Sequence, residues 1–285
     1  MMPSSTLPGA RVIVIVPPIV TARRSLMCSR PYHEHPSAGT SHRVRPGGLR
    51  QTSGTLGADR CMMCALLPVF KKDSSMKNVL CFGDSNTFGT DPADPGTRHP
   101  LDVRWPGRLA SLLGDGWHVI EEGMSGRTSV FDNPLEPHRS GMEALPIVLQ
   151  SHCPLDYAIV MLGTNDLKEM FNASSRIVAA GAEMVARTIR DYDYAGCGPA
   201  PRILLVSPIH IKPGVPYASF AQSAVERSHE LSRWYRKAAE RNGWLFLDAA
   251  TVAEPSDLDK LHMNPEGHAR LADAIAGILL ADAAR

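Results

Sequence analysis

The chain has 285 residues, of which 44% are hydrophobic and 21% are charged, and its formal net charge is +1. This composition is ordinary for a soluble globular protein, and the length suits one large α/β domain or a medium domain with an extension. No apolar run approaches the roughly 20 residues that a membrane-spanning helix needs, so no membrane span is expected.

The small net charge conceals an uneven distribution along the chain. Residues 1–75 carry 10 Lys and Arg against 3 Asp and Glu, whereas the remainder carries 20 against 26. The main body is therefore mildly acidic, and we expect no nucleic acid among its partners.

Residues 1–75 are rich in Pro, Ser, Gly, Arg and His and show no sustained helical or strand period. We predict an unstructured extension, because such a segment buries too little apolar surface to offset its ordering entropy. Either Met76 is the natural translation start and the extension is mis-assigned, or the extension is a targeting or regulatory arm. The apolar stretch from Val12 to Val20 is short and contains two prolines, which does not favour an export signal.

Six cysteines are scattered along the chain without a framework pattern, which predicts reduced thiols in a cytoplasmic protein. Cys61 and Cys64 have the spacing of a zinc or redox pair, but no second pair of this kind follows. His33 and His35 lie upstream in the same extension, and we do not favour a metal site there. We expect neither a metal nor an organic cofactor.

From Met76 onward, short apolar runs alternate with amphipathic stretches. We interpret the apolar runs as strands and the amphipathic stretches as helices, and this alternation predicts a parallel sheet that is covered on both faces. Right-handed crossovers then give a three-layer α/β/α sandwich with a five-stranded parallel sheet, in a single domain over 76–285. Strands are expected over 78–82, 118–121, 156–162, 202–207 and 244–248, and helices over 104–113, 141–151, 175–192, 219–241 and 265–282.

Polar and glycine-rich clusters follow three of the expected strands, and a fourth cluster lies beyond the last strand. The carboxyl ends of parallel strands meet at one edge of a sheet, so we expect all four clusters to meet there. They read GDSN over 83–86, EEGMSGRT over 121–128, GTND over 163–166 and DKLH over 259–262.

Together these clusters contain the groups that ester cleavage by a serine requires. Ser85 supplies a nucleophilic hydroxyl, His262 a base, and Asp259 an acid that can orient the imidazole. An oxyanion could be held by the backbone N–H groups of Ser85 and Gly126 and by the side-chain amide of Asn165.

Each cluster also has a purely structural interpretation. The GDSN stretch could simply be a turn, and Asn165 with Asp166 could cap the following helix. Asp257 is an alternative acid, and His268 is an alternative base that lies within the last helical pattern. The agreement of four clusters at successive positions on one sheet edge favours the catalytic interpretation.

The four clusters taken together resemble the SGNH/GDSL hydrolase family, over residues 77 to 282. The family is named for four residues, which here are Ser85, Gly126, Asn165 and His262, and the resemblance implies Asp259 as the acid of the triad. It also implies a flavodoxin-like α/β/α fold. The first cluster ends in Asn86 where the family name implies leucine, a position that varies within the family.

Three further stretches, over 102–107, 119–128 and 154–166, are similar to the bacterial arylesterase/acyltransferase branch of this family. The likeness implies a cytoplasmic homo-oligomer that hydrolyses short-chain aryl and alkyl esters through an acyl-enzyme, in some members with acyl transfer to alcohols. The expected partner is a small-molecule ester. Candidate residues of the substrate pocket are Asp84, Thr164, Phe88 and Trp105.

Two alternatives stand beside this hypothesis, one an enzyme of the same family and the other from a different functional class. A carbohydrate O-acetyl esterase of the same family would need an open polar groove, whereas Trp105, Phe88 and Phe131 indicate a narrower apolar entrance. A non-catalytic binding module would have no reason to keep Ser85, Asp259 and His262 together. A dinucleotide-binding fold is disfavoured because no GxGxxG motif follows the first strand.

Overall fold

The structure is a computed structural model, and the residues it describes are 76–285. The predictions made for residues 1–75, including the extension itself, the stretch from Val12 to Val20 and the Cys61–Cys64 pair, lie outside the described residues.

A five-stranded parallel sheet forms the middle layer, as the sequence predicts. The strand order is β4-β1-β5-β6-β7, so β1 lies between β4 and β5, where the chain reverses its direction of progress across the sheet. Crevices for ligands form at such switch points, beyond the carboxyl ends of the strands. The strands are β1 (Lys77–Gly83), β4 (Trp117–Gly123), β5 (Tyr157–Met161), β6 (Arg202–Ser207) and β7 (Leu245–Asp248).

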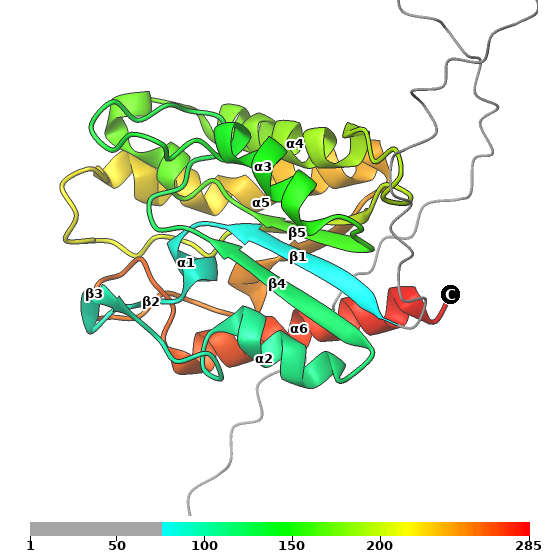
Figure 1. The fold of residues 1–285 in the computed structure, drawn as a ribbon. Coiled ribbons are helices and arrows are strands. Elements are labelled where there is room, and N and C mark those ends of the chain that lie inside the picture. Colours follow the sequence, from blue (N-terminus) through cyan, green and yellow to red (C-terminus); the bar gives the residue numbers. More distant parts are fainter. Residues whose placement is uncertain (1–75) are drawn as a thin grey trace, which may run out of the picture. The chain divides into compact units, whose positions relative to one another are not determined.

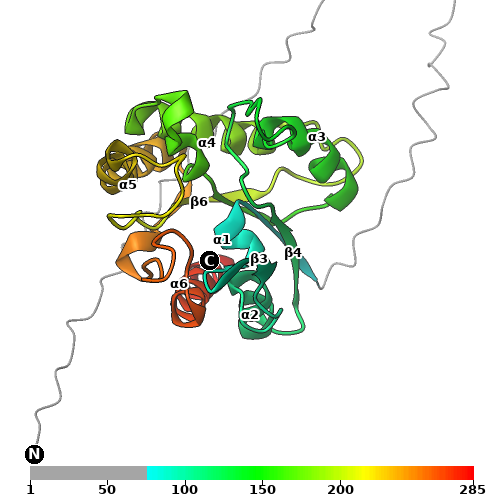
Figure 2. The same ribbon diagram turned by 90° about the vertical axis from the view of Figure 1, so that its left-hand side faces the viewer.

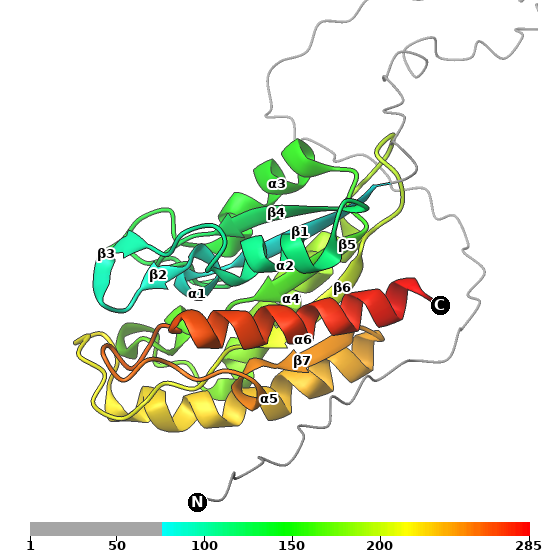
Figure 3. The same cartoon turned by 90° about the horizontal axis from the view of Figure 1, so that it is seen from below.

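Helices cover both faces of the sheet and complete the predicted three-layer sandwich (Figures 1 and 2). Alternate side chains of each strand enter two separate cores: Leu80 and Phe82 of β1 enter one, Val79 and Cys81 the other. Because both faces are buried, the strands need the near-continuous apolar runs that the sequence shows. One face carries α3 (Gly141–His152), α4 (Ser175–Asp191) and α5 (Gln222–Asn242), and the other carries α2 (Trp105–Leu113) and α6 (Pro265–Ala283), which lie side by side in Figure 3.

Local capping explains where two of the helices begin. The Ser174 side chain accepts a hydrogen bond from the backbone N–H of Ile177 at the start of α4. At the start of α6, Asn264 accepts from the N–H of Gly267, and proline occupies the first helical position. These side chains satisfy N–H groups that have no partner within the helix.

A short hairpin between the first strand and α2 was not predicted. It consists of β2 (Thr90–Asp91) and β3 (Asp94–Arg98), and Figure 1 shows it beyond the carboxyl end of β1, beside the short helix α1 (Ser85–Phe88). Arg98 anchors it, through a hydrogen bond to Glu121 of 2.9 Å. All five residues of β3 are exposed, so the hairpin has no alternating pattern for a sequence reading to detect.

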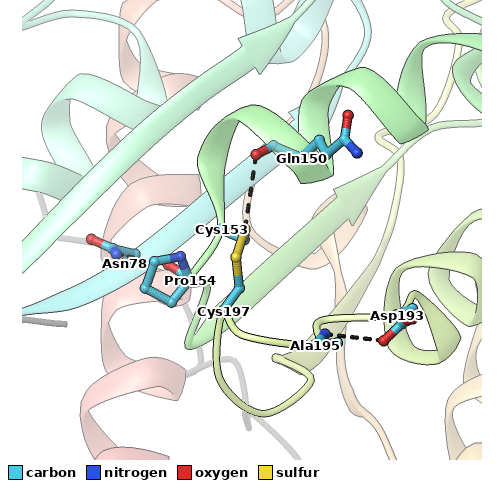
Figure 4. Close-up of a disulfide and its surroundings, with 7 residues drawn as sticks. All are labelled: Asn78, Gln150, Cys153, Pro154, Asp193, Ala195 and Cys197. Carbon is cyan, nitrogen blue, oxygen red and sulfur yellow. Dashed lines mark hydrogen bonds between the residues drawn. A yellow bond between two sulfur atoms is a disulfide. The ribbon is translucent and has the colours of Figure 1, made fainter. Parts of the chain in front are cut away.

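The prediction of reduced cysteines was wrong for one pair. Cys153, directly after α3, forms a disulfide with Cys197, in the loop between α4 and β6 (Figure 4). Their Cα atoms are 5.8 Å apart, although 44 residues separate them in the chain. Their pairing depends on how the two loops meet in the folded protein, and the spacing of the cysteines in the sequence does not predict it.

Cys81 is free and buried. Since disulfides persist mainly in oxidising compartments, the cysteines no longer support a cytoplasmic location. That location now rests on the family resemblance alone and stays a prediction. Within residues 76–285, no helix combines the length and the apolar character needed to cross a membrane.

Candidate active site

The nucleophile candidate lies just beyond the end of β1, which is flanked by β4 and β5. Strand β1 ends at Gly83, and the Asp84 side chain then accepts a 3.0 Å hydrogen bond from the N–H of Asn86, which starts α1 at Ser85. A Cβ atom on Gly83 would lie 2.0 Å from the Thr87 hydroxyl oxygen, so only glycine allows this tight strand-to-helix turn. Ser85 is thereby fixed at the carboxyl edge of the sheet.

The imidazole of His262 connects Ser85 to a carboxylate. Its Nε2 lies 2.9 Å from Ser85 Oγ, and its Nδ1 lies 2.5 Å from Asp259 Oδ2. All three residues are buried. With the Nδ1 proton directed at Asp259, the Nε2 lone pair faces the serine hydroxyl, which is the geometry of general-base activation.

The Asp259 carboxylate is held by the main chain of its own loop. Its Oδ1 accepts the N–H groups of Leu261, at 3.1 Å, and His262, at 2.9 Å. Burial alone would raise the pKa of Asp259, but the hydrogen bonds from His262 and Leu261 outweigh burial and lower the pKa below its usual value. The acid therefore stays ionised beside the imidazole.

Asn86 contributes to this arrangement in a way that sequence reasoning missed. Its side chain donates to the Leu261 carbonyl at 3.3 Å and accepts the N–H of Met263 at 3.0 Å, so it grips the main chain on both sides of His262. Asn86 is buried and adjoins Ser85, so it links the serine loop directly to the histidine loop. The signal was its amide at the position where the family name implies leucine.

The three oxyanion-hole candidates meet in one place. Ser85, Gly126 and Asn165 line the same cavity as His262. Gly126 has a φ of 78°, in the left-handed region that glycine adopts without strain. The Asn165 amide donates one proton to the Arg127 carbonyl at 3.1 Å, and its second proton is available for a ligand.

A buried carboxyl group, that of Asp166, connects the two loops that carry Gly126 and Asn165. Both carboxylate oxygens of Asp166 accept the N–H of Ser129 at 3.0 Å, and the Ser129 hydroxyl binds the same carboxylate. Burial raises the pKa of Asp166 to about 7. Asp166 therefore ties the Asn165 loop to the Gly126 loop, rather than capping a helix as the structural alternative proposed.

Arg127 connects the Gly126 loop to the end of β1, the strand that precedes Ser85. Its Nη1 donates to the Gly83 carbonyl at 3.0 Å and to the Glu122 carbonyl, and its guanidinium lies 4.3 Å from the centre of the Phe82 ring. Burial lowers the pKa of Arg127 to about 10, which still leaves the group charged at neutral pH. The ends of β1 and β4 are thus held together beneath Ser85 and Gly126.

The cavity in front of Ser85 has a volume of about 290 Å³ and a mixed lining. Its wall includes an ion pair, in which Lys168 Nζ lies 2.7 Å from Glu136 Oε2. The predicted narrow apolar entrance is therefore wrong in its polarity. Besides the groups already described, the lining consists of Thr90, Pro95, Ser125, Glu136, Lys168, Tyr217, Ser219, Phe220 and Leu261.

None of the four predicted pocket residues lies on this lining, which corrects that part of the prediction. Trp105 is the first residue of α2 and is fully buried in the core, and Phe88 stacks against Arg98. Asp84 and Thr164 lie with Met161 around a small internal space behind the serine turn. Burial raises the pKa of Asp84 to about 6. The four predicted residues are close to the motifs in sequence, but none of them lies in front of Ser85.

The alternative acid and base lie away from the serine hydroxyl. Asp257 is exposed and pairs with Lys212 at 2.7 Å. His268 is completely buried, accepts the backbone N–H of Trp105 at 3.3 Å, and has its pKa lowered to about 3 by burial. Within the described part of the chain, no group of three or more His, Cys, Asp or Glu side chains is arranged to hold a metal ion.

A serine, an imidazole and a carboxylate aligned in this way, at the switch point of a parallel α/β sheet, define the class of serine hydrolases. The comparisons with known proteins agree. The model of the GDSL-like lipase/acylhydrolase family matches residues 81–270. No match was found among curated proteins.

Two solved structures of esterases are similar to this chain over most of its described length. The carbohydrate acetylesterase Est24 from Sinorhizobium meliloti is 37% identical, with a TM-score of 0.69, over 72% of this chain and 99% of its own. The M. smegmatis aryl esterase is 35% identical, with a TM-score of 0.69 and the same coverage. This chain belongs to the GDSL-like lipase/acylhydrolase family, the SGNH hydrolases, and it is a carboxylic ester hydrolase.

Proposed function

We propose that this enzyme cleaves short-chain aryl and alkyl esters through an acyl-enzyme on Ser85, and that alcohols can replace water as the acyl acceptor. The proposal depends above all on one contact, the 2.9 Å separation of Ser85 Oγ from His262 Nε2. The cavity of about 290 Å³ is small for a ligand site, which favours a short acyl chain.

In the first half-reaction, His262 Nε2 takes the Ser85 proton as Oγ attacks the ester carbonyl. The N–H groups of Ser85 and Gly126 and the amide of Asn165 bind the oxyanion that forms. The intermediate then collapses, and the proton held on His262 passes to the departing alcohol. The acyl group is left on Ser85 Oγ, while Asp259 stabilises the imidazolium throughout.

In the second half-reaction, His262 takes a proton from water, and the resulting hydroxide oxygen attacks the acyl-enzyme carbonyl. Collapse of this second intermediate breaks the bond to Ser85 Oγ and returns the proton from His262 to the serine. An alcohol that enters the cavity in place of water gives a new ester by the same steps.

Loss of p-nitrophenyl acetate hydrolysis in Ser85→Ala tests the proposal. We expect the variant to fold and to lose nearly all activity, because no other group can carry the acyl chain. Ser111→Ala is the matched control, since Ser111 lies on α2, outside the cavity lining, and its hydroxyl donates to the Gly107 carbonyl at 3.4 Å. Retained hydrolysis in a folded Ser85→Ala protein would overturn the mechanism.

A second candidate substrate class, O-acetylated carbohydrates, is favoured by the polar part of the cavity wall. Lys168, Glu136, Thr90 and Ser125 offer hydrogen bonds to a hydroxylated alcohol. The structural relative Est24 is described as a carbohydrate acetylesterase. A panel of aryl acetates and acetylated sugars ranks the two classes by kcat/KM, and a higher value for the sugars would replace the first candidate.

We also propose, from the family resemblance alone, that the enzyme is a cytoplasmic homo-oligomer. Light scattering on the purified protein measures the assembly, and a monomeric mass would reject it. Fractionation of the native cells tests the location.

A further inference from the structure

Tyr217 contacts the acid of the triad from outside the four motif clusters. It lies in the segment between β6 and α5, and its ring is part of the cavity wall. Its hydroxyl donates to Asp259 Oδ2 at 3.1 Å, and its ring meets the His262 imidazole edge to face, with centroids 6.1 Å apart. One side chain therefore faces the substrate cavity, the acid and the base.

The hydroxyl completes the hydrogen bonding of the carboxylate. Asp259 Oδ1 accepts two backbone N–H groups, from Leu261 and His262. In the described structure, Oδ2 accepts the His262 Nδ1 proton and the Tyr217 hydroxyl. Because Oδ2 is the oxygen that faces the imidazole, a second donor there affects both its direction and its charge.

Main-chain contacts hold the Tyr217 segment on two sides. The Lys212 N–H donates to the Lys260 carbonyl at 3.0 Å, next to Asp259 in the histidine loop. On the other side, the Glu169 N–H donates to the Ser219 carbonyl at 2.9 Å, close to the Asn165 loop. The hydroxyl is thus presented from a segment fixed to both halves of the site.

We propose that Tyr217 is a positioning residue whose hydroxyl orients Asp259 Oδ2 toward His262 and moderates the charge that the imidazole experiences. This inference rests on the proposed esterase function, in which His262 must be neutral to accept the Ser85 proton. Burial and the neighbouring Asp259 raise the pKa of Tyr217 to about 12, so the hydroxyl keeps its proton across the working pH range.

The direction of the effect follows from the surrounding charges. Without the hydroxyl, more negative charge stays on Oδ2, which favours the imidazolium over the neutral imidazole. Asp84 and His268 also interact electrostatically with His262. Neither changes in Tyr217→Phe, so a shift between the two proteins reports the hydroxyl.

Tyr217→Phe tests the proposal because it removes the hydroxyl and keeps the ring on the cavity wall. For p-nitrophenyl acetate we expect kcat/KM at pH 7 to fall about tenfold, as for the loss of one hydrogen bond to a charged group, with KM nearly unchanged. The acid limb of the kcat/KM profile should move to higher pH by on the order of half a unit. Tyr194→Phe is the matched control, because it deletes a 2.9 Å hydroxyl bond to the Ile189 carbonyl outside the cavity.

A second measurement separates this inference from the proposed function. The proton between His262 Nδ1 and Asp259 can be followed by proton NMR without any ester, and we expect its resonance to shift in Tyr217→Phe but not in Tyr194→Phe. If wild type hydrolyses no ester, the proposed function fails while this resonance still tests the contact. An unchanged acid limb together with an unchanged resonance would overturn the positioning role. A rise in KM without a change of the pH profile would also overturn it, because Tyr217 would then only shape the cavity.

Discussion

The reacting groups and the cavity wall in front of them are built in different ways. Ser85 lies two residues beyond the end of β1, and the Asp259 carboxylate accepts the backbone N–H of His262 within one short loop. The wall comes from the β2–β3 hairpin, the Glu136 loop, the Lys168 turn and the Tyr217 segment, and the Lys168–Glu136 ion pair joins two of these parts. The reacting groups are therefore held by a strand end and by short main-chain contacts, whereas the cavity wall is built from irregular loops.

Removing an oxyanion donor should give the largest effect among the changes considered next. In Asn165→Ala we expect kcat for p-nitrophenyl acetate to fall by about 10²–10³, because the amide acts on charge that forms only in the transition state. KM should change much less. Circular dichroism confirms folding, and Asn172→Ala, outside the cavity lining, is the control. A loss expressed mainly in KM would place Asn165 among the wall residues instead.

Changing the wall should alter selectivity more than chemistry. Lys168→Met removes the cation that pairs with Glu136. In the described structure, Lys168 makes no hydrogen bond to Ser85 or to His262. We expect kcat/KM for p-nitrophenyl acetate to stay within about threefold of wild type, since a partly exposed ion pair contributes little by itself. The ratio of acetylated sugar to aryl acetate hydrolysis should fall.

Lys237→Met, on α5, is the matched control for the wall variant because Lys237 lies outside the cavity lining. A large loss with every ester would show that Lys168 serves the reacting groups and would break the division between chemistry and wall.

The smallest effect on activity is expected at the opposite edge of the sheet. In the Cys153→Ser, Cys197→Ser double variant the free energy of unfolding should fall by about 3–4 kcal/mol, since the disulfide closes a loop of 44 residues. The value of kcat should be unchanged, because the carboxyl edge keeps all its contacts. Thermal unfolding and esterase assays measure the two quantities on the same sample, and a drop in kcat at temperatures where the variant is folded would contradict the separation.

The sheet and the reacting groups could be predicted because each has a local signature. Apolar runs such as 78–82 mark buried parallel strands, and the short DKLH stretch carries acid and base together. The topology rule then brings Ser85, Gly126, Asn165 and His262 to one edge.

The cavity wall could not be predicted, because the residues that form it are far apart in the sequence. Lys168 meets Glu136 across 32 residues, and Tyr217 meets Asp259 across 42. Phe88 and Trp105 lie close to the motifs in sequence, yet Phe88 stacks on Arg98 and Trp105 is fully buried in the core at the start of α2. Contacts between loops depend on the finished fold, as does the Cys153–Cys197 disulfide.

The most direct test of the account is the site of covalent labelling by a fluorophosphonate. Such a reagent phosphonylates a serine that a neighbouring base activates, and intact-mass and peptide mass spectrometry locate the adduct. The account predicts one adduct per chain, on Ser85, formed by wild type and absent in Ser85→Ala. An unlabelled wild-type protein, or an adduct on another residue, would contradict it.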